Sequence, residues 1–183
     1  MDFDLQTDRL LLRRWRGADR EPFARLNADA EVMRYFPALL SRAESDALAG
    51  RADALFDAHG YGLWALERRD TGEFIGFTGL APMSAGIPGS GGVEVGWRLS
   101  RAAWGQGFAT EAATAALQFG FDTLGLAEVN SITAVVNIRS RQVMERLGMH
   151  AGDEFNHPRL PAGSSLRLHI RYQLAAPVRP DAV

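Results

Sequence analysis

The sequence predicts a single α+β domain built on one mixed β-sheet, with helices packed on both faces. Its 183 residues suit one compact core, and no repeat or interdomain linker divides them. Strand patterns dominate the first half, with a hairpin signal at residues 61–80, and the stretch 93–136 has the length of a β-α-β unit. A hairpin joins antiparallel strands and a β-α-β unit joins parallel ones, so we expect both pairings in one sheet.

Three strands and two helices are expected before residue 81. The strand segments are apolar, with a turn signal at Arg69-Asp70-Thr71-Gly72, and are expected at residues 10–15, 61–68 and 73–80. Asp19 and Ser41 can each cap a helix through the side-chain oxygen. The helices are therefore expected at residues 20–28 and 42–58, the second closing at Gly60.

A loop rich in Gly and Pro at residues 81–92 separates the two halves of the chain. Beyond it, strands are expected at residues 93–99, 128–136 and 166–174. Helices are expected from the turn after residue 99 to about 124 and from 137 to 147, where Gly148 suits a left-handed cap. A second loop is expected at 153–165, and residues 175–183 should form a frayed tail.

The composition excludes several chemistries. The chain has no Cys, which rules out disulfides, thiolate metal sites and a cysteine nucleophile. All 20 basic residues are Arg, so a Schiff-base lysine and a P-loop lysine are absent as well. The four His lack the i, i+4 spacing of a helical metal pair, and we expect no metal site.

The charge and the apolar pattern indicate where the protein works. A net charge of −2 argues against nucleic acid or an anionic membrane as the main partner. No apolar run approaches the roughly 18 residues of a membrane span, and the acidic start is unlike a signal peptide. We therefore expect a cytoplasmic enzyme or binding domain, with a homodimer left open.

A glycine turn, Trp104-Gly105-Gln106-Gly107-Phe108-Ala109-Thr110, lies between an expected strand and an expected helix. Glycines let the backbone approach a ligand, and amides at a helix start attract phosphate oxygens. By itself this signal is weak, because glycine turns often precede helices that bind nothing. Thr110 replaces the third glycine of a dinucleotide fingerprint, and the missing lysine excludes a P-loop.

Several ordered motifs accompany the turn and together resemble one known family. They are Thr7-Asp8-Arg9-Leu10-Leu11-Leu12-Arg13, Glu94-Val95-Gly96-Trp97-Arg98-Leu99, the turn continued through Glu111-Ala112, Asn137-x-x-Ser140, and Arg146-Leu147-Gly148-Met149. This arrangement resembles the GNAT superfamily of N-acetyltransferases, and within it the RimJ/RimL-type branch of ribosomal-protein N-terminal acetyltransferases. The resemblance covers about residues 7–174.

The resemblance implies the fold and an acetyl-CoA site. The sheet should have about seven strands, mostly antiparallel and splayed at the cofactor. In this family the glycine turn binds the pyrophosphate of acetyl-CoA through backbone amides, and the preceding strand binds the pantetheine arm. The implied cofactor-binding residues are Trp97, Arg98, Leu99, Trp104, Gly105, Gln106, Gly107, Phe108, Ala109, Thr110, Asn137 and Ser140. Asn137 is an equally good helix N-cap.

Acetyl transfer to an amine requires a base for the nucleophile and a proton for the leaving thiolate. Glu94 is the candidate base, since burial in an apolar strand would raise its pKa; the alternative is a structural carboxylate on a strand bulge. Ser140 is the implied proton donor, with a helix-surface role as the alternative. Met144 occupies the position of the tyrosine that many relatives use as the acid, and the thiolate could also leave without help.

These residues predict an N-acetyltransferase that moves an acetyl group to a primary amine by direct attack in a ternary complex. The acceptor would be a small molecule or a protein N-terminus, and His157 and His169 are candidates to line its pocket. The alternative is a non-catalytic acyl-CoA-binding sensor, which Met144 favours and which Glu94 and Ser140 oppose.

Overall fold

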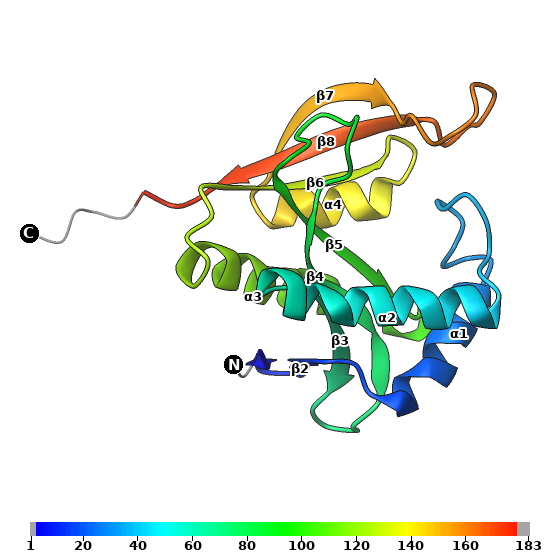
Figure 1. Cartoon of the computed structure of the whole chain (residues 1–183), viewed down its shortest axis with the longest axis vertical. Coiled ribbons are helices and arrows are strands. Elements are labelled where there is room, and N and C mark those ends of the chain that lie inside the picture. The colour runs from blue at the N-terminus through cyan, green and yellow to red at the C-terminus, as the bar shows by residue number, and fades with distance from the viewer. Residues whose placement is uncertain (1–2, 179–183) are drawn as a thin grey trace, which may run out of the picture.

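The computed structural model describes residues 3–178 and contains one eight-stranded sheet in the order β1-β2-β3-β4-β5-β6-β8-β7 (Figure 1). The strands are β1 (Leu5–Gln6), β2 (Leu10–Arg13), β3 (Leu63–Arg68), β4 (Phe74–Pro82), β5 (Val93–Leu99), β6 (Glu128–Ala134), β7 (His150–Asn156) and β8 (Leu168–Ala175). The α-helices are α1 (Arg20–Ala28), α2 (Arg42–His59), α3 (Phe108–Asp122) and α4 (Ile138–Arg146). Short 3-10 turns precede α1 and α3 at Gly17–Asp19 and Arg101–Ala103.

The sheet is mixed, as the sequence predicts. Every neighbouring pair is antiparallel except β5 and β6, which α3 connects as parallel strands. That parallel pairing consists of one residue pair, Glu94 with Asn130. Beyond it the two strands diverge, so the sheet is splayed between β5 and β6.

Helices cover both faces of the sheet at β5. Val95 and Leu99 belong to the main apolar core, which includes Ala112 and Ala116 of α3. Successive side chains of a strand point to opposite faces, and the intervening Arg98 contacts Asn27 of α1 on the other side. α3 and α1 therefore lie on opposite faces of this strand.

The helix caps agree with the sequence in one case and differ in another. Ser41 caps α2 in a reciprocal capping box with Glu44, and Gly60 ends the helix with a φ of 75°. Asp19 occupies the N-cap position of α1 but makes no side-chain cap bond. The expected cap is wrong because the Asp19 carboxylate binds the Arg13 guanidinium and the Arg16 amide instead.

Two strands were not expected from the sequence. β1 is only two residues long, and the side chains of β7 are exposed apart from a half-buried Phe155, so neither shows the apolar alternation that predicts a strand. The expected loop at 153–165 is wrong at its start, because β7 extends to Asn156 and residues 154–156 pair with β8. β8 also continues to Ala175, and Ala176 donates its amide to the Ala127 carbonyl at 2.8 Å. Residues 179–183 of the expected tail lie outside the described residues.

Candidate functional site

The glycine turn has the geometry of an anion-binding loop. Gly105 and Gly107 have φ values of 75° and 83°, a conformation that side chains disfavour, and Gly107 forms the N-cap of α3. Among the described residues, no hydrogen bond engages the backbone amides of residues 105–110, whereas Trp104 and Glu111 donate theirs locally. Six amides at the positive end of a helix are thus available to a phosphate-bearing ligand.

Arg9 holds this turn in place from the segment between β1 and β2. Its guanidinium donates to the Gln106 carbonyl at 2.9 Å and to the Glu111 carboxylate at 2.7 Å, and it lies 4.5 Å from the Phe108 ring centre. Thr7 also donates to Glu111, at 2.5 Å. Burial opposes ionisation of Glu111, but the hydrogen bonds from Thr7 and Arg9 outweigh it and lower the pKa of this carboxyl. The sequence marked Thr7 and Arg9 as part of a motif without indicating this role.

The first turn of α4 lies beside the glycine turn, because the Arg139 guanidinium is 4.8 Å from the Trp104 ring centre. Asn137 is the N-cap of α4: its side-chain oxygen accepts the Ser140 amide at 3.3 Å, and its amide group donates to Thr133. The Ser140 hydroxyl makes no hydrogen bond within the described part of the chain. The structure therefore places both residues at the start of α4, beside the glycine turn.

The splay leaves backbone groups of β5 without a strand partner. The Ser100 amide donates to the Ile75 carbonyl of β4. Because backbone groups of a strand face its two neighbours alternately, the even-numbered residues of β5 are the ones that hydrogen-bond to β4. The backbone groups of Trp97 and Leu99 then face the gap toward β6, where strand pairing has ended. The Leu99 carbonyl accepts the Trp104 indole N–H at 2.9 Å, so the remaining free groups are those of Trp97 and the Leu99 amide.

Arg98, a predicted cofactor residue, has its backbone turned away from this gap. Its backbone faces β4 by the same alternation, and its side chain lies on the opposite face of the sheet, against Asn27. The sequence motif places Arg98 beside Trp97 and Leu99 along the chain, but the two-residue period of a strand turns it away from them.

Glu94 lies where the splay begins, opposite Asn130. Burial raises the pKa of its carboxyl to about 7, although the positive charge of Arg159 acts in the opposite direction. Within the described residues its carboxylate accepts no hydrogen bond, so it is open to a ligand. The β4–β5 register runs without a shift from Val93 to Leu99, which removes the alternative of a carboxylate on a bulge. At neutral pH this group is poised to accept a proton.

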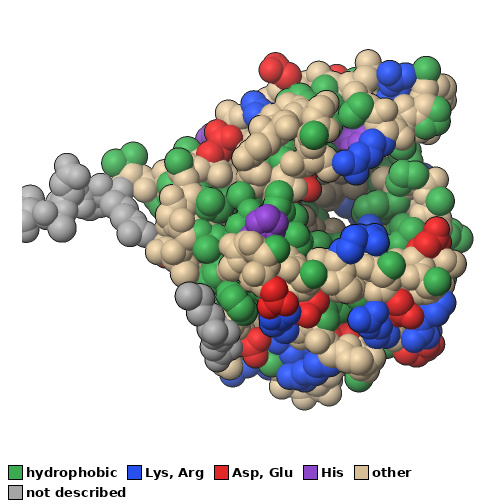
Figure 2. All heavy atoms as spheres, in the orientation of Figure 1, with side chains coloured by type: hydrophobic (Ala, Val, Ile, Leu, Met, Phe, Trp, Pro, Cys, Tyr) green, Lys and Arg blue, Asp and Glu red, His purple; other side chains and the backbone are tan. Residues whose placement is uncertain are grey.

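A groove opens on the face shown in Figure 2, as a hollow between α2 and the segment that joins β7 to β8. Arginine side chains gather on its rim, and the chain has no lysine. The His157 and His169 rings are 4.8 Å apart, and burial lowers the pKa of each. Met144, by contrast, is 1% exposed and packs in the core, where it has no access to a ligand.

A splayed sheet with a glycine turn and an open carboxylate at the same gap defines the class of protein as an acyltransferase of the acetyl-CoA type. Residues 9–150 match the family model for the acetyltransferase (GNAT) domain. That match covers most of the chain, which therefore belongs to the GNAT acetyltransferase family. Enzymes of this family use acetyl-CoA as the acetyl donor.

Individual relatives agree with the family assignment. The chain is 32% identical over 147 residues to the uncharacterized protein YkkB of Bacillus subtilis, covering 80% of this chain and 84% of that protein. It is 32% identical over 178 residues to the FsC-acetyl coenzyme A-N(2)-transacetylase of Aspergillus fumigatus, covering 93% and 75%. A GNAT-family acetyltransferase from Bacillus anthracis superposes with a TM-score of 0.80 at 20% identity, covering 95% and 99%, which shows a shared fold.

No helix among residues 3–178 has the length and apolar content to span a membrane.

Proposed function

We propose that this protein is an acetyl-CoA-dependent N-acetyltransferase that acetylates a primary amine by direct attack in a ternary complex. The observation that carries the proposal is the position of Glu94, an unpaired carboxyl with a pKa of about 7 at the edge of the splayed gap. Such a pKa matches a general base that works at neutral pH.

Different residues of the chain would bind the cofactor and transfer protons. When bound, acetyl-CoA supplies the acetyl group as an activated thioester. The free amides of the glycine turn would bind its pyrophosphate, and the free backbone groups of Trp97 and Leu99 would bind its pantetheine arm. Glu94 would take a proton from the attacking amine, directly or through water, while the Leu99 or Trp97 amide stabilises the developing oxyanion. The Ser140 hydroxyl would supply a proton to the leaving thiolate.

A nitrogen acceptor is supported by the name of one relative, which describes an N(2)-transacetylase that uses an acetyl coenzyme A donor. The RimJ/RimL-type branch, and with it a protein N-terminus as acceptor, rests on the motif that begins at Thr7. A small-molecule amine is the other candidate, because the fold and cofactor site of a family outlast its acceptor specificity. A cytoplasmic location is part of the same proposal.

Thiol release from acetyl-CoA across a panel of primary amines tests the proposal. We expect turnover with at least one amine, and a fall in kcat of about 10²- to 10⁴-fold in Glu94→Gln, as for loss of a general base. Glu73→Gln is the matched control, since Glu73 is exposed at the β3–β4 turn and should leave kcat unchanged. An unaltered kcat in Glu94→Gln would exclude its role as the base.

The sensor alternative predicts a different result in the same assay. Met144 is buried where many relatives place the acid, and this feature favours a domain that binds the cofactor without turning it over. Thermal stabilisation by acetyl-CoA together with no thiol release on any amine would support the sensor. Stabilisation together with turnover would reject it.

A further inference from the structure

Arg98 is a partly buried cation, and no carboxylate within residues 3–178 forms an ion pair with it. Its Nη1 donates to the Asn27 side-chain oxygen at 2.5 Å, and the guanidinium lies 3.9 Å from the Phe36 ring centre and 5.5 Å from that of Phe77. Its Nε is buried and has no hydrogen-bond partner among the described residues. Burial lowers the pKa of Arg98 to about 10, so the group remains charged at neutral pH.

The free part of Arg98 is the edge that arginine uses to bind a carboxylate. Arg14 presents its Nε and Nη2 to the two oxygens of Asp53, at 2.9 and 2.8 Å, and Arg68 does the same with Asp70. In Arg98 neither Nε nor Nη2 has a bond within residues 3–178, and no ion pair forms there. An edge of this kind can donate two parallel hydrogen bonds to a planar carboxylate.

Arg98 and Glu94 lie on one face of β5, and Gly96 is the residue between them on that face. The two-residue period of a strand puts positions 94, 96 and 98 on the same face. Position 96 is a glycine, and a side chain added there would meet no atom within 4 Å. The floor of the groove therefore has a carboxyl at one end and a guanidinium at the other, with their backbones about 13 Å apart at a rise of about 3.3 Å per residue.

Asn27 keeps Arg98 available for a ligand. The Asn27 side chain is fully buried, its oxygen accepts from Arg98, and its amide group donates to the Ser45 hydroxyl of α2 at 2.8 Å. A neutral partner orients the guanidinium without cancelling its charge, and a buried charge left in this state is costly until an anion binds.

We infer that the acceptor is an amine that also carries a carboxylate, which Arg98 binds while the amine meets Glu94. The inference rests on the proposed function, because Glu94 and the gap behind it place the reacting amine. The acceptor class is then amino acids and related amino-carboxylates. Several bonds should separate the amine from the carboxylate, so that the molecule extends past Gly96 from Glu94 to Arg98.

Matched acceptor pairs test this inference. The probes are 4-aminobutyrate and 6-aminohexanoate, each compared with its neutral amide in the thiol-release assay. We expect kcat/KM for the better acid to exceed that of its amide at least tenfold, about 1.4 kcal/mol. In Arg98→Met this ratio should fall to about one, as the charge that distinguishes acid from amide is gone.

Asn27→Asp is the second variant, and it leaves Arg98 in place. The new carboxylate would pair with Arg98 and cancel its charge, so the acid-to-amide ratio should again fall to about one. This variant keeps the size and shape of the side chain and decides the question if Arg98→Met does not fold. Arg25→Met is the control, because Arg25 is exposed on α1 and pairs with Glu21. The ratio should remain above ten in this variant.

The inference is overturned if the acids and amides react equally well, or if the preference survives in both Arg98→Met and Asn27→Asp. Turnover without any acid preference would leave the acetyltransferase function standing and remove only the inference. Where no probe reacts, the proposed function loses support, and calorimetry with 6-aminohexanoate and coenzyme A decides the inference. Binding that Arg98→Met abolishes would support it, and no binding to the unaltered protein would contradict it.

Discussion

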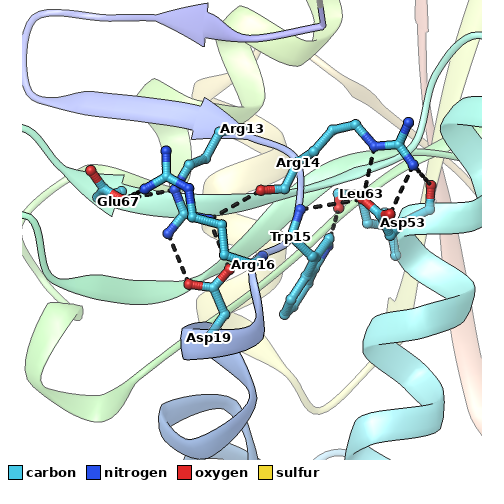
Figure 3. A network of polar contacts seen from close by, with 8 residues as sticks. All are labelled: Arg13, Arg14, Trp15, Arg16, Asp19, Asp53, Leu63 and Glu67. Carbon is cyan, nitrogen blue, oxygen red and sulfur yellow. Dashed lines mark hydrogen bonds and ion pairs between the residues drawn. The ribbon is translucent and has the colours of Figure 1, made fainter.

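Arginines in two regions of this protein have opposite surroundings. Arg13, at the end of β2, is 3% exposed and gives both terminal nitrogens to Asp19 and its Nε to Glu67, all at 2.7 to 2.8 Å (Figure 3). Arg14 beside it binds both oxygens of Asp53 through Nε and Nη2. Arg98, on β5, has one neutral partner and a free edge.

The difference in hydrogen-bond partners distinguishes arginines that stabilise the fold from an arginine that can bind a ligand. A buried guanidinium whose donors are all bonded to carboxylates is neutralised, and removing it leaves buried anions behind. A buried guanidinium with unused donors destabilises the protein until a ligand supplies the missing oxygens. The first kind fixes β2 against α1, and the second lies at the groove.

The largest effect on stability is expected from Arg13→Met. This change leaves the Asp19 and Glu67 carboxylates without their main partner, and we expect a loss of about 3–5 kcal/mol in the free energy of unfolding. Urea unfolding followed by circular dichroism measures it. A loss below about 1 kcal/mol would show that the network in Figure 3 contributes little to stability.

Arg98→Met should behave differently in the same urea experiment. It removes one hydrogen bond to Asn27 and leaves no carboxylate behind, so the free energy of unfolding should change by no more than about 1 kcal/mol. A gain in stability is also compatible with the account, since a buried charge is removed. A loss as large as that of Arg13→Met would mean that Arg98 is structural and would erase the contrast between the two regions.

The smallest effect concerns Arg159, whose positive charge lowers the pKa of Glu94. Arg159→Gln removes that charge, so the pKa of Glu94 should rise further above its ordinary value. Because the base acts when deprotonated, the ascending limb of the kcat/KM profile should move to higher pH by a fraction of a unit, with lower activity below pH 7. Arg146→Gln, an exposed residue of α4, is the control and should leave the limb in place.

Much of the fold and the chemistry of the gap follow from local sequence signals. The length of the β-α-β unit predicts the parallel pairing of β5 and β6. Gly105 and Gly107 predict a turn with positive φ values, which residues with a side chain rarely adopt. Glu94 is predictable as a buried carboxyl because apolar residues flank it. These signals lie within a few residues of the feature that they specify.

Features that depend on distant contacts could not be predicted in this way. β7 is recognised only through its pairing with β8, since its own side chains are mostly exposed. Arg9 reaches Gln106 and Glu111 across about a hundred positions of the sequence. The role of Arg98 depends on Asn27 being its partner instead of a carboxylate, and no local pattern shows which residue of another helix will face a strand.

The pH dependence of kcat/KM with and without Glu94 tests directly whether Glu94 is the general base. For the unaltered protein and a reacting amine, the account predicts an ascending limb centred at about pH 7, where the Glu94 carboxyl loses its proton. In Glu94→Gln this limb should disappear between pH 6 and 8, at a much lower rate. A limb at pH 7 that persists in Glu94→Gln would contradict the account and assign the titration to another group.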